Sequence, residues 1–463
     1  MCTYHGGTVV VAQEFRVALS LFRHRDYRHL FTAQLVALFG TGLTTVALGL
    51  LAYDFAGAGA GAVLGTALAI KMVTYVTVAP LAGAYADRVP RRVMLVCLDL
   101  VRALVVLALP FVDRIWQVYA LIVVLQSASA AFTPTFQAVL PDILPGERDY
   151  TRALSASQLA STMESLLSPV LAAAALSVVS FHWLFTGTSA GFLVSAVLVV
   201  TTRIPDAVRS HRGGAWDRTL AGARIYAATP RLRGVMGFNL VVAAVGSVVM
   251  VNTVNYVRDE LGRGQADVAV LLAANGVGTV LVALLLPRVL DRVRERTVML
   301  AGAAVLLAGI AGAIPLSMVA GGSWFAALAV WVTVGLGTGL VLTPVGRVLR
   351  RSSTAADRPA VFAAQFSLSH ACWLVAYPIA GWLATEAGFG VTWIVLAGLG
   401  VVGAVVAIRA WPRCDRDVLE HVHDGTGDPG HLADATEIAA GVWQHRHEYV
   451  IDREHDRWPA LVR

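Results

Sequence analysis

The sequence is poor in charged residues and rich in apolar ones. Charged residues make up 14% of the 463 positions, against about 25% in soluble domains, and apolar residues make up 57%. A soluble enzyme with a single membrane anchor does not need this excess, so the composition excludes that class. The apolar residues suffice for about a dozen membrane spans of roughly 20 residues each.

Lysine is almost absent, because Lys71 is the only lysine among 36 basic residues. A phosphate-binding loop ends in Gly-Lys, and this one lysine does not stand in such a loop, which argues against ATP-driven pumping.

The four cysteines, Cys2, Cys97, Cys372 and Cys414, have neither metal-binding nor disulfide spacing. The sequence therefore predicts neither a cofactor nor an enzyme activity.

Twelve apolar runs of span length follow one another along the chain. Because a backbone in lipid must satisfy its own hydrogen bonds, each run predicts a transmembrane helix. The expected fold class is all-α, a polytopic membrane protein of twelve helices. The runs cover residues 30–52, 62–84, 93–112, 115–137, 153–179, 183–202, 234–257, 267–287, 298–318, 324–346, 360–385 and 389–410.

The placement of positive charge predicts the orientation. With the N-terminus inside, the cytoplasmic segments before the last helix carry 24 arginines, and the external loops carry only Arg114, Arg258 and Arg263. This asymmetry places both termini in the cytoplasm and the chain in the cell inner (cytoplasmic) membrane. The N-terminal region, polar through Arg28, has no cleavable signal peptide, which agrees. The formal charge of +6 thus reports topology and does not indicate a nucleic-acid partner.

The chain repeats itself at an offset of about 204–210 residues. The matching pairs are Asp87-Arg88 with Asp291-Arg292, Thr133-Pro134 with Thr343-Pro344, and Pro169 with Pro378. We therefore predict two six-helix halves, residues 1–202 and 234–410, joined by a cytoplasmic linker at 203–233 and followed by a cytoplasmic tail at 411–463. Repeats of this kind place a substrate site between the halves, near the middle of the bilayer.

The loop after the second helix carries the most specific motif, which reads Gly83-Ala-Tyr-Ala-Asp87-Arg88-Val-Pro90-Arg91-Arg92. A degenerate copy, Asp291-Arg292-Val-Arg294-Glu295-Arg296, occupies the equivalent loop of the second half. The motif resembles the signature of the major facilitator superfamily. The chain is similar to the exporter branch of that family, which holds siderophore, macrolide and metal-resistance efflux proteins, at Phe132-Thr133-Pro134, Leu140-Pro141-Asp142 and Pro230-Arg231-Leu232.

The resemblance implies a gate that locks the cytoplasmic side in the outward-open state. Its residues would be Gly83, Asp87, Arg88, Arg91, Arg92, Asp291 and Arg292. The alternative is that the arginines of this motif only set the topology.

Ionisable residues inside apolar runs are expensive in lipid and are functional candidates by default. Glu164, near the middle of the fifth run, is the best candidate for carrying a proton. Lys71 either snorkels to the outer interface or faces a cavity, where it would bind an anionic group or exchange a proton with a carboxylate. Asp99 and Arg102 stand three residues apart on one helical face and should pair with each other.

Further polar residues in the runs are candidates for a transport cavity. His370 precedes Pro378 by eight residues, as Ser161 precedes Pro169, so the repeat puts both at equivalent places. The alternative for each is a packing role. Other repeat-matched positions are Gln34 with Asn239, and Lys71 with Asn275.

The tail is acidic and holds half of the twelve histidines. Two His-x-His pairs, His421 with His423 and His445 with His447, would suit nickel, zinc or cobalt. A solvated acidic tail without metal is the alternative.

These features predict a secondary transporter, acting as a monomer in membrane lipid, that exports a drug-like or siderophore-like solute in exchange for protons. Two alternatives remain open. One is a divalent metal exporter assisted by the tail, and the other is a transport-inactive membrane sensor or scaffold.

Overall fold

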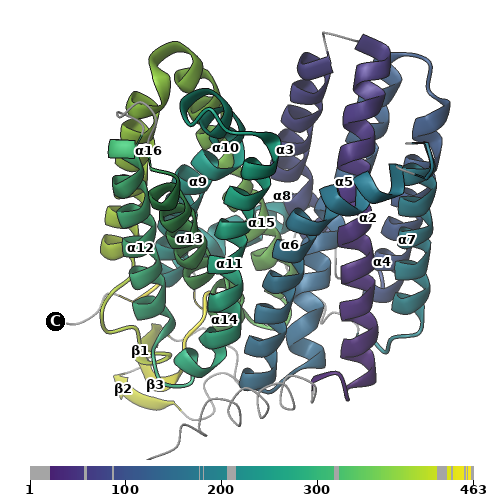
Figure 1. Ribbon diagram of the computed structural model, residues 1–463. Helices are drawn as coiled ribbons and strands as arrows, with labels where there is room; N and C mark the ends of the chain where they lie inside the picture. The colour runs from purple at the N-terminus through teal and green to yellow at the C-terminus, as the bar shows by residue number, and fades with distance from the viewer. Residues whose placement is uncertain are drawn as a thin grey trace, which may run out of the picture.

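The computed structural model describes residues 21–56, 60–85, 88–176, 178–180, 182–205, 215–316, 323–424, 435–439, 442–452, 455 and 457–459. These residues form a helical bundle in two parts, with a small sheet at one end (Figure 1). Below, "sheet end" means the end that carries α8, α14 and the sheet, and "far end" means the other.

The first half of the chain forms six long helices. Each follows an apolar run, because a helix satisfies every backbone hydrogen bond within the segment. Within this half α2 packs on α7 and α6, α4 packs on α7, and α3 packs on α5. The elements are α2 (Arg25–Ala56), α3 (Ala60–Tyr85), α4 (Arg91–Ala108) with the turn η2 (Leu109–Phe111), α5 (Ile115–Ile143), α6 (Glu147–Leu176) and α7 (His182–Val200).

The second half repeats this plan with more interruptions. Two π-helical segments, η3 (Val248–Asn252) and η4 (Tyr256–Glu260), lie in the helix that starts with α9 (Pro230–Ser247) and includes α10 (Thr253–Asn255). A third, η5 (Ile379–Leu383), follows Pro378. The remaining helices are α11 (Gln265–Leu290), α12 (Glu295–Leu316), α13 (Trp324–Leu342), α14 (Val345–Arg351), α15 (Arg358–Pro378) and α16 (Ala384–Ala410).

The two halves differ in helix structure at one of the sequence pairs that the repeat matches. Thr133-Pro134 lies inside the continuous helix α5, whereas Thr343-Pro344 separates α13 from α14. The break leaves α14 as a separate short helix at the sheet end (Figure 1).

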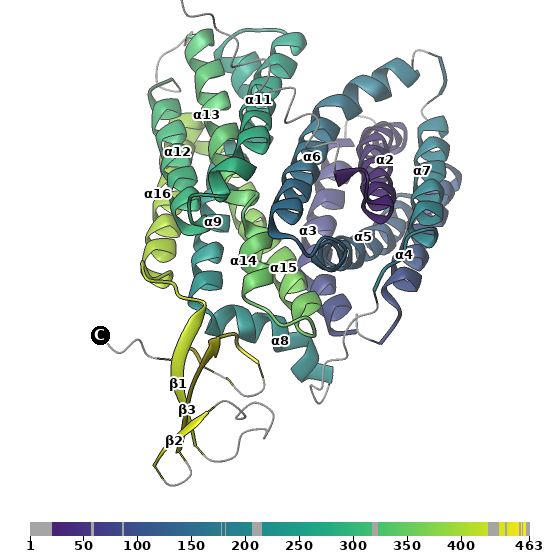
Figure 2. The ribbon, with the colours of Figure 1, turned by 90° about the horizontal axis from the view of Figure 1, so that it is seen from below.

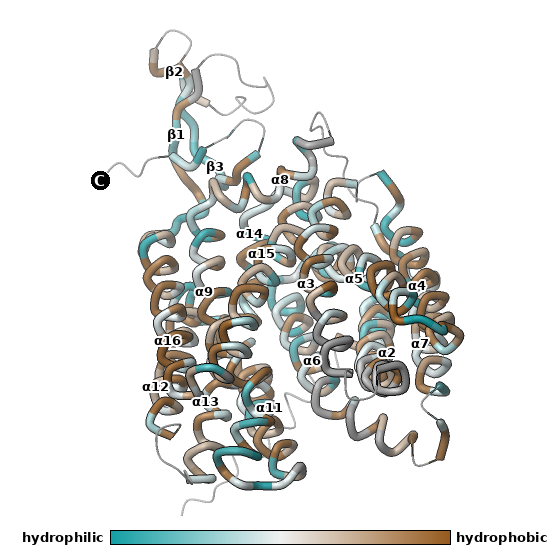
Figure 3. The backbone as a smooth tube through the Cα atoms, turned by 90° about the horizontal axis from the view of Figure 1, so that it is seen from above, coloured by the Kyte–Doolittle hydropathy of each residue, from teal (hydrophilic) through white to brown (hydrophobic). Residues whose placement is uncertain are grey.

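Among the described residues, nine helices are long and apolar enough to cross a membrane. Three more helices, α2, α3 and α6, have 32, 26 and 30 residues and lie beside them in the bundle (Figure 1). Large apolar side chains are exposed on the bundle, among them Leu104, Val197 and Leu285. Apolar residues dominate the helices of both halves (Figure 3). An exposed apolar surface of this kind is suited to lipid and not to water.

The two halves meet chiefly along two helix pairs. Helix α3 packs on α15, and α6 packs on α11, while α5 makes a smaller contact with α15. At the sheet end α8 (Ala215–Ala228) contacts both α3 and α15 (Figure 2). Helix α8 and the start of α9 occupy much of the segment 203–233, which the sequence predicts to be a polar linker.

The tail corrects the all-α prediction. Residues of the tail form an antiparallel sheet in the order β1-β3-β2, with β1 at Val418–Asp424, β2 at Thr436–Ala439 and β3 at Val442–Glu448. The sheet is anchored because Leu419, Tyr449 and Ile451 join Trp411 in the apolar core of the second half. The high polar content of the tail concealed this small set of buried apolar residues, so the described part of the tail is a folded element.

Candidate transport site and gate

The structure brings together three ionisable residues that the sequence singles out separately. Lys71 on α3 is an electrostatic neighbour of Glu164 on α6 and of His370 on α15. The Lys71 ammonium also lies 5.6 Å from the ring centroid of Tyr75, one helical turn further along α3. We call Lys71, Tyr75, Glu164 and His370 the central charge cluster. Its members come from both halves of the molecule.

Lys71 lines a cavity within the first half. The cavity has a volume of about 60 Å³ and is lined by Lys71 with Thr41, Thr44, Gln126 and several apolar side chains. Hydroxyl and amide groups around an ammonium supply hydrogen-bond acceptors that lipid lacks. Lys71 therefore has a polar environment inside the protein.

Glu164 lies at a close approach of α6 to Gly42 of α2. A Cβ atom added at Gly42 of α2 would lie 2.5 Å from Glu164 Oε1. Along the same helix the Ser157 hydroxyl donates to Gln34 Oε1 at 3.0 Å, and the Ser161 hydroxyl donates to the Ser157 carbonyl at 3.2 Å. Ser161 and Gln34 thus belong to the packed polar seam between α2 and α6.

His370 is the contribution of the second half to the central charge cluster. Its Nδ1 lies 2.7 Å from the Phe366 carbonyl oxygen, so this nitrogen carries the proton. The ring packs edge-on against Tyr75, with centroids 4.8 Å apart, across the α3–α15 interface. Motion of one half against the other would change this contact.

Asp99 and Arg102 contact each other, as their spacing predicts. Asp99 accepts hydrogen bonds from Arg102 and, at 2.8 Å, from the Ser195 hydroxyl. The Arg102 guanidinium lies between the rings of Phe132 and Phe192, at 3.9 and 4.5 Å from their centroids. The pair is buried within the first half and joins α4 to α7.

The two asparagines at repeat-matched positions serve helix packing. Asn239 is buried and exchanges hydrogen bonds with Gln365, which also accepts one from Tyr226. Asn275 donates to the Trp331 carbonyl at 3.2 Å and so joins α11 to α13. Neither lies in the central charge cluster.

The residues of the motif after the second helix differ in their contacts: some are buried and paired, and others are exposed. Gly83 lets α3 approach α15, because a Cβ there would lie 2.6 Å from the Cβ of Ala363. Arg91 is buried and pairs with Asp142 at 2.5 Å. Arg88 and Arg92 are exposed, and Asp87 lies outside the described residues.

Asp142, at the end of α5, connects the two halves. One carboxylate oxygen pairs with Arg91 of the first half, and the other pairs with Arg358 at the start of α15. The repeat copy of the motif makes a second link, from Asp291 to Arg148 at 3.3 Å, although Arg148 is largely exposed. Arg292 is exposed.

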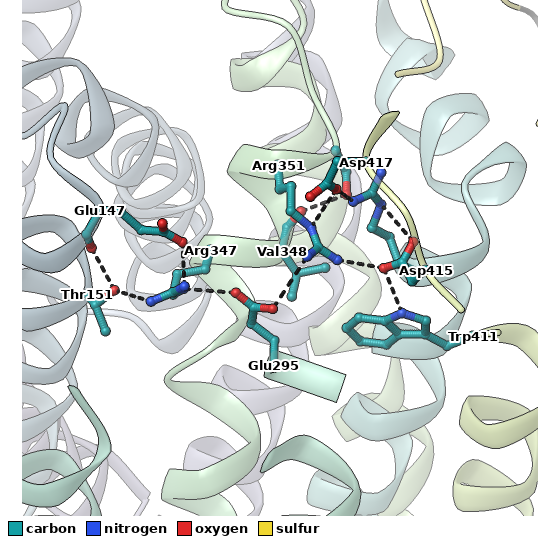
Figure 4. A network of polar contacts seen from close by, with 11 residues as sticks. Glu147, Thr151, Glu295, Arg347, Val348, Arg351, Trp411, Asp415 and Asp417 are labelled. Atoms are coloured by element: carbon teal, nitrogen blue, oxygen red, sulfur yellow. Dashed lines mark hydrogen bonds and ion pairs between the residues drawn. The ribbon is translucent and has the colours of Figure 1, made fainter. Parts of the chain in front are cut away.

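Arg347 on α14 makes the most extensive link between the halves (Figure 4). Its Nε pairs with the buried Glu295 of its own half at 3.0 Å. Its other nitrogens reach the first half, where they contact the Glu147 carboxylate and, at 2.9 Å, the Thr151 hydroxyl. We call the contacts of Asp142, Arg358, Glu147, Thr151, Arg347 and Glu295 the inter-half network.

The inter-half network continues into the root of the sheet (Figure 4). Arg351 pairs with Glu295 at 3.5 Å, with Asp415 at 2.5 Å and with Asp417 at 3.2 Å. Arg231 on α9 pairs with Asp417 at 2.6 Å. An unbroken chain of charged contacts therefore runs from the first half to the strand β1.

The histidine cluster lies on this sheet. The ligand atoms of His421, His445, His447 and His455 all lie within 4.8 Å of one another. The sequence predicts His423 in place of His455. The side chain of His423 lies outside the described residues, and His455 occupies the fourth position.

Sequence reasoning missed the residues that join the halves, namely Asp142, Glu147, Glu295, Arg347 and Arg358. The arginines counted only as topology signals, and the acidic residues among them passed as loop charges. The available signal was the repeated presence of a carboxylate in segments that otherwise carry positive charge.

Two helical halves of membrane-spanning length, with ionisable residues inside the helices and an ion-pair network that joins the halves at one end, are typical of a membrane transporter. The family model of the Major Facilitator Superfamily matches residues 30–253 and 234–434. The chain belongs to the major facilitator superfamily, as its sequence motifs indicate.

Part of the chain is similar to curated transporters, one of them an efflux protein. An MFS-type transporter of Bacillus subtilis, YfiS, is 27% identical over 124 residues, which are 27% of this chain and 30% of the relative. Macrolide efflux protein A of Streptococcus pyogenes is 26% identical over 152 residues, 32% of this chain and 37% of the relative. The chain thus spans about a third of the length of these relatives.

Solved structures share the fold at low identity. The human organic anion transporter MFSD10 has a TM-score of 0.69 at 14% identity, covering 83% of this chain and 99% of the other. A bacterial homologue of the iron transporter ferroportin, in an outward-facing state, has a TM-score of 0.69 at 15% identity with the same coverage.

Proposed function

We propose that this transporter is a proton-coupled exporter of a small organic solute, with twelve spans, both termini in the cytoplasm and a location in the inner membrane. The observation that carries the proposal is the central charge cluster, in which the Lys71 ammonium interacts electrostatically with Glu164 of its own half and lies near Tyr75, which packs on His370 of the second half. The match to a macrolide efflux protein supports an organic solute and the outward direction.

The pattern of contacts supports an outward-open state. Among the residues that the structure describes, the ion pairs that join the halves all lie at the sheet end. The same end carries the arginines that the charge asymmetry assigns to the cytoplasm. A closed cytoplasmic end leaves the far end as the route to the central charge cluster.

The opposite charges of Lys71 and Glu164 provide a way to couple proton binding to solute binding. Ionised Glu164 and Lys71 together carry no net charge, which suits a site enclosed by membrane-spanning helices. A proton on Glu164 leaves Lys71 uncompensated, so proton binding changes the charge presented to a solute. Proton and solute then favour different forms of one site, which is the requirement for exchange.

The experiment uses the full chain in proteoliposomes. Macrolides, siderophores and other drug-like solutes are first screened for thermal stabilisation, and the best solute then drives proton movement reported by an internal pH dye. Glu164→Gln should abolish solute-driven proton movement while the solute still stabilises the protein. Glu386→Gln, which alters an exposed carboxylate at the start of α16, is the matched control. Unchanged coupling in Glu164→Gln would overturn the assignment.

Divalent metal export is the second candidate, and the histidine cluster is the observation that favours it. Lys71 opposes it, because its ammonium repels a metal cation that approaches the central charge cluster. Tolerance of expressing cells to nickel, cobalt and zinc tests this candidate. The variant for this test is His445→Ala with His455→Ala. Removal of the whole tail is unsuitable, because it would also remove Asp415 and Asp417, which pair with Arg351.

A further inference from the structure

Four imidazoles converge on one point of the C-terminal sheet. His421 comes from β1, His445 and His447 come from β3, and His455 follows the strand. The register pairs His421 directly with His445 across the two strands. The Nε2 atom of His421 lies 2.9 Å from that of His455 and 3.0 Å from that of His445. The cluster therefore has a common centre.

The outer contacts of three of these rings place a hydrogen on Nδ1. Nδ1 of His421 lies 3.3 Å from the Leu419 carbonyl, Nδ1 of His455 lies 2.9 Å from the Asp452 carboxylate, and Nδ1 of His447 lies 2.6 Å from the Glu448 carbonyl. Because carbonyl and carboxylate oxygens only accept, each of these Nδ1 atoms carries the hydrogen. In the neutral rings Nε2 is then a lone pair that points toward the other histidines.

Neutral imidazole is the form in which histidine binds metals. Two strands and the segment after β3 bring the ligand atoms of four imidazoles within 4.8 Å of one another, so a single ion can contact all four once the rings adjust to it.

The dimensions suit a tetrahedral ion. A zinc–nitrogen bond of about 2.0–2.1 Å gives nitrogens roughly 3.3 Å apart at tetrahedral angles. The separations from His421 Nε2 to His455 and His445, 2.9 and 3.0 Å, are a few tenths of an ångström shorter than this, and the ligand atoms of the cluster lie up to 4.8 Å apart, so binding draws the rings toward one centre. The outer contact of His455 with Asp452 is the carboxylate–histidine arrangement that orients metal ligands.

We propose that His421, His445, His447 and His455 bind one divalent ion of the zinc, nickel and cobalt class, and that this ion regulates the gate at the sheet end. Imidazole ligands suit these borderline ions, whereas magnesium and calcium prefer oxygen. The site is separate from the central charge cluster and does not depend on which solute is exported.

The regulatory role follows from the position of the sheet. Asp417 precedes β1 by one residue, pairs with Arg231 and Arg351, and accepts a backbone hydrogen bond from Tyr449 at 2.7 Å. The ring of Tyr449 packs against His421 and His455, with centroids 4.8 and 4.5 Å apart. Tyr449 also lines a cavity of about 430 Å³ together with Glu147, Arg347 and Arg358 of the inter-half network. An ion that fixes the cluster therefore fixes the support of the gate.

The binding test uses the purified full chain and Co²⁺ as a spectroscopic probe. The expected result is one Co²⁺ per chain with the visible absorption of tetrahedral nitrogen coordination, displaced by Zn²⁺ and unaffected by Mg²⁺. His445→Ala with His455→Ala should abolish this absorption, and His182→Ala, an exposed histidine at the start of α7, should preserve it. Because the double variant removes buried side chains, His447→Gln provides a milder second variant that should weaken binding at least tenfold.

The regulatory test follows the distance between the halves at the sheet end with spin labels on Val89→Cys and Val289→Cys in a cysteine-free chain. Zn²⁺ should at least double the ratio of closed to open populations, and the double histidine variant should not respond. Equal Co²⁺ absorption in wild type and double variant, or no absorption in wild type, would overturn the site. Tight binding with unchanged distances would overturn the regulatory role.

Discussion

Arg347 is the residue whose loss should open the sheet end most directly. In the closed state its guanidinium holds Glu295 within its own half and Glu147 and Thr151 in the other half. The contact with Glu295 persists when the halves separate, so it contributes equally to both states. Only the contacts with Glu147 and Thr151 favour closure.

The magnitude follows from the burial of these two contacts. The Glu147 side chain is 67% exposed, which limits its contribution to about 0.2–1 kcal/mol. The hydrogen bond from the charged guanidinium to Thr151 contributes about 1.5–3 kcal/mol. Arg347→Ala should therefore shift the equilibrium toward the open form by about 2–4 kcal/mol. At about 1.4 kcal/mol per tenfold, this is a factor of roughly 30 to several hundred.

The assay is the distance distribution between spin labels on Val89→Cys and Val289→Cys, which are exposed positions of the two halves. The wild type should show mainly the short distance, and Arg347→Ala mainly the long one. Thr151→Val removes only the hydroxyl and should give an intermediate shift. Arg292→Ala removes an exposed arginine at the same end and should give none. If Arg347→Ala matched Arg292→Ala, the inter-half network would not be a gate.

Two further substitutions test the packing around the central residues. Gly42→Ala should destabilise the protein by about 1–3 kcal/mol in a thermal melt and impair transport, because the added Cβ would press on Glu164. Its control is Gly187→Ala, which places the Cβ in open space and should be neutral or stabilising. Asp99→Asn should cost about 3–5 kcal/mol in the same melt, because it leaves the Arg102 guanidinium buried without its carboxylate, and Asp99→Leu combined with Arg102→Met should recover most of the loss.

The sequence predicts those features of the site that depend on local residue spacing or on residue types that are rare in their segment. The i, i+3 spacing places Asp99 and Arg102 on one helical face, and the structure pairs them. Scarcity of charge in apolar runs marks Lys71, Glu164 and His370, because a buried charge is tolerated only for a reason. One sequence gives no contact between distant helices, so it does not reveal that these three belong to one cluster.

The inter-half network shows the same limit of prediction from the sequence, because its contacts also join residues that are far apart along the chain. Arg347 and Glu147 lie 200 positions apart, and nothing in either segment indicates that they meet. The sheet is hidden for a different reason. Leu419, Tyr449 and Ile451 are too few to raise the apolar content of the tail, yet they suffice because Trp411 and the second half complete their core.

The inequality of the two halves bears on the proton exchange proposed above, because it decides which charges move relative to one another. Lys71 and Glu164 both belong to the first half, so rigid rocking moves them together and leaves their mutual attraction unchanged. The repeat counterpart of Lys71 is Asn275, which is occupied with the Trp331 carbonyl. From the second half, His370 and Phe366 both pack on Tyr75 of the central charge cluster. In the proposed exchange, rocking changes the proton affinity of Glu164 through its access to water and through contacts that cross the interface, and among the members of the cluster His370 is the ionisable group that makes such a contact.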